Sequence, residues 1–353
     1  MIAPVRTLWR GFGRRGPLYA MVQVTARCNL RCRMCQVWTL EHQGGEELPT
    51  RRYPEMARIF SEAGIQVVTL AGEPFLRDDL AEIVAAFAER GLSVRIQSNG
   101  TLVTRERADA VVAAGLRGIS ISLHSLDPAR MAWIEGREGV LDEVLAGVEA
   151  IRAATRGRRR FLRFLNAVLF QGNLEEIPAL VTYAARQGFR LSVSPVHVSS
   201  LRTEERQFVP RLGEGLALRP EDRPRLEAVS AFLLEQRRHS RTVLNSSAFL
   251  RMLPRYVDGE PLPWSCLAGT LYAFVDHLGR VAACHDLPPV GSVFDPEVIR
   301  TLVAGDLGGR SRADRAACPG CLLPCWTELS LLFSHPGAFL EGVEANLPRV
   351  RAS

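Results

Sequence analysis

The feature that most constrains the fold of this chain is a regular alternation of short β-type runs with segments of helical periodicity. Runs rich in β-branched and other apolar residues predict strands at residues 18–25, 66–71, 93–97, 118–123, 163–170 and 190–196. Between them, apolar residues spaced at i, i+3, i+4 and i+7 predict five crossover helices, whose first core positions are Met56, Leu80, Ala108, Leu141 and Ile177. Strands linked in this way pair in parallel through right-handed connections. The periodicity therefore predicts an α/β fold, either an incomplete barrel or an open doubly wound sheet.

Composition limits the kind of protein this can be. The 353 residues are 47% hydrophobic, which is enough for a large core. No run approaches the roughly 18 apolar residues that a membrane span requires, and no secretory signal precedes the first strand, so a cytoplasmic location is expected. In that compartment, eight cysteines favour metal or redox sites over disulfides.

The basic residues exclude several classes of chemistry. The net charge of +6 rests on arginine alone, because the chain contains no lysine. A Schiff-base lysine, a phosphate-loop lysine and a lysine general base are therefore ruled out. Arginines gather at Arg10, Arg14 and Arg15 and at residues 156–160. Neither group is interleaved with stacking aromatics, so both are expected to be solvated surface, and nucleic acid is not an expected partner.

Chemistry is expected where the parallel strands end, because the active sites of such folds form there. The first predicted strand is followed by Cys28-Asn-Leu-Arg-Cys32-Arg-Met-Cys35. Three thiols in eight residues can converge on one metal centre and leave one coordination position open, as a catalytic metal requires. A structural zinc site, which a fourth ligand would normally close, and a chance group of buried thiols are the alternatives.

The C-x3-C-x2-C spacing directly after a first strand resembles the signature of the radical S-adenosylmethionine (SAM) superfamily, and the resemblance covers residues 18–196. It implies a partial parallel (β/α)6 barrel in which Cys28, Cys32 and Cys35 bind a [4Fe-4S] cluster whose fourth iron takes SAM. The position before the third cysteine is usually aromatic in that family and is Met34 here. Methionine can still pack against an adenine ring.

Polar residues at the next strand ends resemble the SAM-binding motifs of the same family. The sequence Ala-Gly-Glu-Pro at residues 71–74 is similar to the family's Gly-Gly-Glu-Pro motif with the first glycine replaced. Its carboxylate, on Glu73, is expected to accept a hydrogen bond from the SAM ammonium. The polar residues that end the third and fourth strands stand where the family places further SAM contacts. The resemblance therefore implies a set of cofactor-binding residues: Gly72, Glu73, Pro74, Ser98, Asn99 and Ser122.

The alternation ends after residue 196, and five more cysteines follow. Cys266 and Cys284 flank a predicted hairpin within residues 270–283, and the C-x2-C pair Cys318 and Cys321 precedes Cys325. By itself this set favours a zinc knuckle. After a radical SAM barrel, however, C-x12-G-x4-C followed by C-x2-C resembles the SPASM and twitch extensions, which bind auxiliary [4Fe-4S] clusters. One cluster needs four of the five thiols. The tight turn inside the C-x2-C pair favours Cys318 and Cys321 as ligands, and whether Cys325 is a ligand is left open.

These patterns predict four regions along the chain. Residues 1–17 form a basic N-terminal extension, and residues 18–198 form the radical SAM partial barrel. Residues 199–260 form a linker and helical region, with a helix at about residues 224–238. Residues 261–353 form a small α+β cysteine-rich module of the SPASM or twitch type.

The resemblance implies an enzyme of the oxidoreductase or maturase type that reductively cleaves SAM to a 5′-deoxyadenosyl radical, which abstracts a hydrogen atom from the substrate. With the auxiliary cluster, the product would be oxidised, rearranged or cross-linked, and a flavodoxin or ferredoxin is the expected electron donor. Only about 17 residues precede the first strand, where peptide-modifying relatives often carry a leader-binding domain, so a small metabolite is favoured over a peptide or protein substrate.

His124 is the candidate catalytic residue, because it follows the fourth strand, although a structural histidine is equally compatible with its position. A non-catalytic iron–sulfur or zinc-binding module is the remote alternative for the whole chain. It would leave the Gly-Glu-Pro motif at the second strand end unexplained.

Overall fold

The computed structural model describes residues 16–40, 47–198, 215–259, 262–307, 318, 320–335, 337–338 and 340–341. Within them, nine strands form one sheet in the order β6-β5-β4-β3-β2-β1-β7-β8-β9. The arginines predicted to form a basic N-terminal surface and most of the predicted linker after residue 198 lie outside the described residues.

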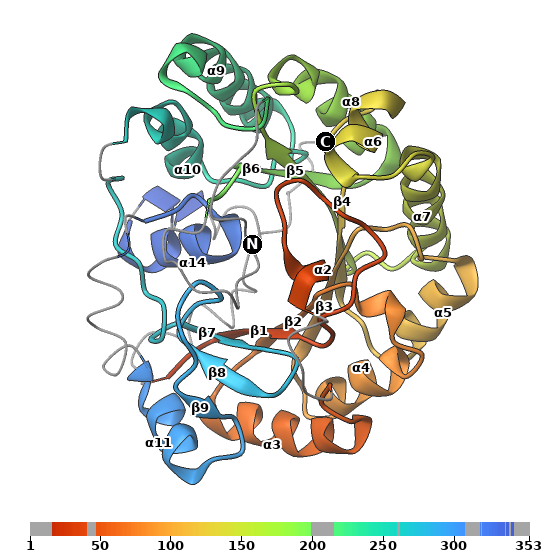
Figure 1. Cartoon of the computed structure of the whole chain (residues 1–353), viewed down its shortest axis with the longest axis vertical. Helices are drawn as coiled ribbons and strands as arrows, with labels where there is room; N and C mark the ends of the chain where they lie inside the picture. The colour runs from red at the N-terminus through yellow and green to blue at the C-terminus, as the bar shows by residue number, and fades with distance from the viewer. Residues whose placement is uncertain are drawn as a thin grey trace, which may run out of the picture.

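The first six strands are parallel and curve into an open barrel (Figure 1). Their bounds are β1 Tyr19–Gln23, β2 Val67–Ala71, β3 Ser93–Ser98, β4 Gly118–Ser122, β5 Leu162–Leu169 and β6 Arg190–Pro195. Each lies within two residues of its predicted position, and the predicted partial barrel is confirmed. Strand side chains alternate between the barrel interior and the helical layer, since successive residues of a strand point to opposite faces.

Helices cover the outer face of the barrel (Figure 1). The five predicted crossover helices are α3 Tyr53–Ala63, α4 Leu80–Ala88, α5 Arg105–Ala113, α7 Val140–Ala154 and α8 Ile177–Gln187. Their predicted core positions are buried against the sheet: Met56, Leu80, Ala108, Leu141 and Ile177. The short helix α2 Val37–Leu40 follows the first cysteine motif.

One helix was not predicted. Helix α6, Pro128–Glu135, lies between β4 and α7 and is capped by Asp127, whose side chain accepts a hydrogen bond from the Arg130 N–H. Its buried residues are Met131, Ile134 and Glu135. A buried acidic residue on so short a helix breaks the apolar periodicity on which the sequence prediction depends.

The C-terminal residues add helices and a strand extension. The helices are α9 Arg223–His239, α10 Ser247–Met252, α11 Pro296–Ala304 and α14 Pro324–Ser334, and the strands are β7 Tyr272–Val275, β8 Arg280–Ala282 and β9 Gly291–Ser292. The predicted hairpin is present as the antiparallel pair β7 and β8. Unexpectedly, β7 also pairs in parallel with β1, which makes the hairpin continuous with the barrel sheet.

Helix α14 packs between the hairpin and the free edge of the barrel near β6 (Figure 1). Its Trp326 is 1% exposed. The indole stacks on the ring of Tyr272 at a centroid distance of 4.4 Å and meets Tyr19 edge-on at 5.8 Å. These aromatic contacts hold the C-terminal helix against the first strand.

In the part of the chain that the structure describes, we find no helix with the length and apolarity needed to cross a membrane.

Removing the Trp326 ring tests this packing. Trp326→Ala should lower the free energy of unfolding by about 3–5 kcal/mol, because a large buried ring leaves a cavity between α14 and β7. Val303→Ala on α11, where the side chain is 41% exposed, is the control and should change it by less than about 0.5 kcal/mol. Chemical denaturation followed by near-ultraviolet circular dichroism measures both, and equal effects would contradict the packing role.

Candidate functional site

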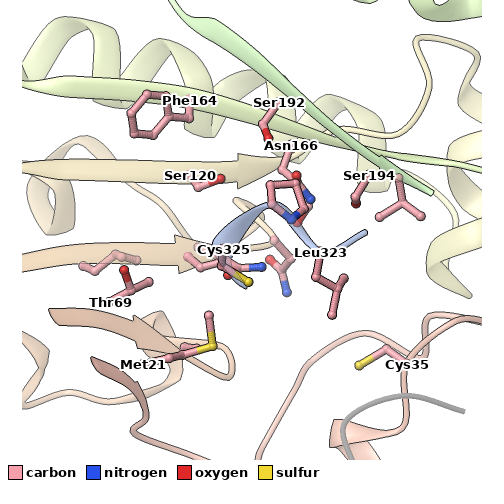
Figure 2. Close-up of a pocket in the computed structure, with 18 of the residues that line it drawn as sticks. Met21, Cys35, Thr69, Ser120, Phe164, Asn166, Ser192, Ser194, Leu323 and Cys325 are labelled. Carbon is pink, nitrogen blue, oxygen red and sulfur yellow. The ribbon is translucent and has the colours of Figure 1, made fainter. Parts of the chain in front are cut away.

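The barrel encloses a cavity of about 300 Å³ that reaches the carboxyl ends of its strands. Figure 2 shows side chains from five strands around it: Met21, Thr69, Ser120, Phe164, Asn166, Ser192 and Ser194. The same cavity is lined by the first three cysteines of the chain, which lie on the loop after β1. The first cysteine motif and the strand interiors therefore face one space.

The three loop thiols are partly buried. Burial raises the pKa of Cys28 to about 11 and that of Cys35 to about 12, and it raises the pKa of Cys32 well above its ordinary value. Bound iron would supply the positive charge that such thiols need in order to ionise. The donor set therefore fits an iron–sulfur cluster held by Cys28, Cys32 and Cys35.

The unpredicted helix α6 anchors this cysteine loop. The Arg31 N–H donates to the Glu135 carbonyl at 3.1 Å, and the Arg33 N–H donates to the Ile134 carbonyl at 2.9 Å. Gly136 caps the helix with φ 76°, and a Cβ there would lie 2.6 Å from the Arg31 carbonyl oxygen. The backbone at the end of α6 is thus fitted against the loop that carries Cys32.

Glu73 is a buried acid of the cavity whose carboxylate accepts three hydrogen bonds. It is 1% exposed, and its carboxylate accepts hydrogen bonds from Phe75 N–H at 3.2 Å, Ser98 Oγ at 2.9 Å and Asn99 N–H at 2.7 Å. Burial raises the pKa of Glu73 to about 7, and the three hydrogen bonds oppose that rise. Oε1 accepts two of these bonds and Oε2 one, so Oε2 retains acceptor capacity for a cation in the cavity.

Two features place this carboxylate beside the cysteine loop. Gly72 has φ 88°, and a Cβ there would lie 2.3 Å from the Thr25 carbonyl oxygen, so only glycine lets the end of β2 approach the chain after β1. On the other side, the Asn99 side chain donates to Asn29 Oδ1 at 2.9 Å and lies 3.9 Å from the Cys28 sulfur. The turn after β3 therefore links Glu73 to Cys28.

The predicted cofactor-binding residues meet at one place. Five of them line the cavity: Gly72, Glu73, Ser98, Asn99 and Ser122. Pro74 does not line it; this residue begins the short 3-10 turn Pro74–Leu76, which carries the Phe75 N–H to Glu73. Their roles as SAM ligands remain predictions.

His124 lies on the cavity wall with both ring nitrogens engaged. The Val168 N–H donates to His124 Nδ1 at 3.1 Å, so the ring proton is on Nε2, which is 3.2 Å from Glu135 Oε1. The Cys32 thiol donates to the other Glu135 oxygen at 3.0 Å. The geometry favours a positioning role, in which His124 orients Glu135 beside the cysteine loop; direct catalysis by His124 stays a prediction.

Several polar wall residues were missed by the sequence analysis. They are Arg95, Gln97, Asn166, Ser192 and Ser194, all of which line the cavity. The signal was present in β4 and β6, where serine alternates with isoleucine, leucine or valine. A polar residue at every second position indicates a polar barrel interior, which an ordinary barrel filled by branched apolar side chains lacks.

The later cysteines separate into two environments. The thiols of Cys266, Cys284 and Cys321 interact electrostatically with one another, and Cys318 acts on Cys321 in the same way. Cys325 also acts on Cys321, but it lines the barrel cavity, as Figure 2 shows. Cys321 thus interacts with each of the other four later thiols, and Cys325 is the one of the five that lines the barrel cavity.

Neither cysteine set is arranged for a single ion. Among the described residues, no three histidine, cysteine, aspartate or glutamate side chains converge closely enough to hold one metal ion. A zinc site requires such convergence, whereas each thiolate of a four-iron cluster binds a different iron, so its ligands lie farther apart.

Comparison with known families agrees with this site. Residues 22–184 match the family described as the Radical SAM superfamily. The chain therefore carries the domain that defines this superfamily, whose members bind a [4Fe-4S] cluster and SAM. The family predicted from the cysteine motif is confirmed.

Two named relatives cover different shares of the chain. It is 37% identical to GTP 3′,8-cyclase 1 of Pseudomonas aeruginosa over 180 residues, which are 49% of this chain and 53% of that protein. It is 28% identical to the PqqA peptide cyclase of Xanthomonas campestris pv. campestris over 272 residues, which are 76% of this chain and 67% of that protein. The match thus spans about half the length of the first relative.

Solved structures confirm the fold. SuiB of Streptococcus suis, bound to its precursor peptide SuiA, superposes with a TM-score of 0.66 at 16% identity over 88% of this chain and 70% of that chain. The structure described as native anSMEcpe with bound AdoMet superposes with a TM-score of 0.61 at 13% identity, over 94% of this chain and 96% of that chain.

Replacing the Glu73 carboxylate, which can accept a further hydrogen bond at Oε2, tests the proposed SAM site. Glu73→Gln keeps the shape and removes the charge, so SAM affinity should fall about 10- to 150-fold, given roughly 1.5–3 kcal/mol for a hydrogen bond to a charged group. Calorimetry on anaerobically reconstituted protein measures the affinity. Iron content should not change, and Glu62→Gln on the exposed face of α3 should bind SAM normally. Unaltered SAM binding by Glu73→Gln would contradict this placement.

Proposed function

We propose that this chain is a radical SAM enzyme that abstracts a hydrogen atom from a substrate bound inside the barrel. The observation that carries the proposal is that three cluster-type thiols, the Glu73 carboxylate and a polar barrel wall all face one cavity. The bound cluster and SAM would supply a 5′-deoxyadenosyl radical after one-electron reduction. The protein has to bind SAM, exclude water and aim one C–H bond at the radical carbon.

The roles of the residues follow from their contacts. Cys28, Cys32 and Cys35 would hold the cluster, with α6 keeping their loop in place. Oε2 of Glu73 would accept a hydrogen bond from the SAM ammonium. Ser98 and Asn99 hold that carboxylate through hydrogen bonds, so they would act mainly by positioning it.

The auxiliary site supports oxidation, rearrangement or cross-linking as the net reaction. We assign Cys266, Cys284, Cys318 and Cys321 as its ligands, because the first three all interact with Cys321, whereas Cys325, which also interacts with Cys321, faces the barrel cavity. A cluster there could accept an electron from the substrate radical or relay one to it. A flavodoxin or ferredoxin would serve as the external electron donor.

Two substrate classes remain. A small metabolite is supported by the barrel cavity of about 300 Å³ and by the hydroxyl groups on its wall. Peptide modification is the second candidate, supported by the similarity to the PqqA peptide cyclase, since 272 aligned residues exceed the barrel region and must include part of the C-terminal module. The similarity to the GTP cyclase covers less of the chain.

The proposed function is tested by metal content and SAM cleavage. Anaerobically reconstituted protein should bind about eight irons per chain, four per cluster, and should form 5′-deoxyadenosine from SAM and dithionite. Replacing Cys28, Cys32 and Cys35 by alanine should remove half of the iron and abolish cleavage. Cys284→Ala is the matched control, because it should lose the other half and retain uncoupled cleavage.

Two results would count against these assignments. A protein with intact clusters that forms no 5′-deoxyadenosine would not be a radical SAM enzyme of this kind. Stoichiometric zinc together with only four irons would remove the auxiliary cluster from the proposal.

The position of Cys325 gives a separate prediction. In the background that lacks the first three cysteines, Cys325→Ala should keep the electron paramagnetic resonance signal of the reduced auxiliary cluster, whereas Cys266→Ala, Cys284→Ala or Cys318→Ala should lose it. The physical reason is that four thiolates complete the cluster while the Cys325 thiol points to the barrel cavity. Loss of the signal in Cys325→Ala with retention in Cys318→Ala would reverse the assignment.

A further inference from the structure

Arg95 on β3 is a buried cation whose hydrogen-bonding capacity is largely unused. The residue is 5% exposed and lines the barrel cavity. Its Nε and Nη1 atoms are buried and have no hydrogen-bond partner. A buried guanidinium without partners is costly to the folded protein, so its retention calls for a ligand that satisfies it.

No acid of the cavity neutralises this charge. Among the described residues, Glu73 and Glu135 are the carboxylates that line it; the first is bonded to the turn after β3 and the second to Cys32 and His124, and neither acts on the charge of Arg95. Burial lowers the pKa of Arg95 to about 10, so the guanidinium is still protonated at neutral pH. In the part of the chain that the structure describes, the cavity therefore presents a positive charge that no lining carboxylate compensates.

The position of Arg95 separates it from the SAM end of the cavity. In the sheet register it pairs with Thr69 on β2 and with Gly118 on β4. It precedes Ser98 by three residues, which places its Cα about 10 Å below the strand end where Glu73 is bonded. Arg95 thus lies deeper in the barrel than the proposed SAM contacts.

The surroundings of Arg95 are polar and close to the C-terminal module. Thr69 pairs directly with Arg95, and both line the cavity. Tyr19 interacts electrostatically with Arg95 and also with Cys325 of α14. The space beside Arg95 is therefore bounded by hydroxyl-bearing side chains and by the helix that carries the last cysteine.

We propose that Arg95 forms an oxyanion subsite deep in the barrel, which binds a carboxylate or phosphate group of the substrate. The planar guanidinium can donate two parallel hydrogen bonds to such a group, and the burial of Arg95 away from solvent strengthens that ion pair. A substrate held there would extend from Arg95 toward the SAM end. This inference rests on the proposed function, because it assigns the substrate class of the same cavity.

The test uses the full-length protein with both clusters reconstituted and SAM bound. The probes are inorganic phosphate and acetate, each titrated by calorimetry at constant ionic strength. We expect one of them to bind once per chain, and the one that binds identifies the group as phosphate or carboxylate. Arg95→Met should weaken that binding about 10- to 150-fold, the change expected when a charged hydrogen-bond donor is removed. Arg117→Met, on the exposed residue before β4, is the matched control and should bind the probe normally.

Thermal unfolding supplies a second readout that does not depend on activity. The bound probe should raise the unfolding midpoint of the wild-type protein and leave that of Arg95→Met unchanged. Without probe, Arg95→Met should unfold at the same or a higher temperature, because an apolar side chain of similar length replaces an unpaired buried charge. A large loss of stability in Arg95→Met would show a structural role and overturn the inference.

Other outcomes are equally decisive. Equal binding of the probe by the wild type and Arg95→Met, or no binding of either probe, would overturn the subsite. A loss of SAM affinity in Arg95→Met would assign Arg95 to the SAM carboxylate instead, and the proposed function would stand without the subsite. Failure of the wild type to form 5′-deoxyadenosine would remove the proposed function, and probe binding would then be judged on its own.

Discussion

Backbone pairing of β1 on both of its edges is the interaction on which the rest of the structure depends. Strand Tyr19–Gln23 bonds to β2 on one side and to β7 on the other, and all five of its residues are buried. The cysteine loop begins five residues after this strand, so the strand sets where the loop leaves the sheet. Because β7 belongs to the C-terminal hairpin, the same strand fixes both cysteine sets relative to one cavity. Hydrogen-bonded strand pairing is rigid enough to do this, whereas a flexible linker would not be.

The polarity of the barrel interior is the second constraint. Inward residues of β4 and β6 are serines, and the helix-facing residues of the same strands are apolar. A sheet buried on both faces would normally be apolar throughout. Hydroxyl groups can lie on this wall because it borders a cavity rather than a packed core, and the Glu73 carboxylate beside them is held by hydrogen bonds from Ser98 and Asn99. Apolar contacts with the helical layer thus stabilise the sheet, whereas the side chains that face the cavity are available to bind a ligand.

The sequence predicted those elements whose pattern depends on residues close together in the chain. Strand positions follow from apolar runs, and the crossover helices follow from their periodicity, because both patterns report which face of an element is buried. Helix α6 was missed because its buried Glu135 looks like a surface residue until the partners His124 and Cys32 are known. The burial of the Arg95 charge was likewise not predicted, since burial of a cation inside a barrel leaves no mark in the neighbouring residues.

By itself the sequence determined the parallel α/β class, the position of the first cysteine motif after strand one, the residues grouped around Glu73 and the hairpin between Cys266 and Cys284. Only the tertiary structure decided that this hairpin joins β1, that α14 brings Cys325 to the barrel cavity, and that Arg95 stands there without a counter-charge. The physical reason is the separation along the chain of the residues that interact. Periodicity and turn chemistry act over a few residues, whereas strand pairing and the neutralisation of buried charge join residues far apart in the chain.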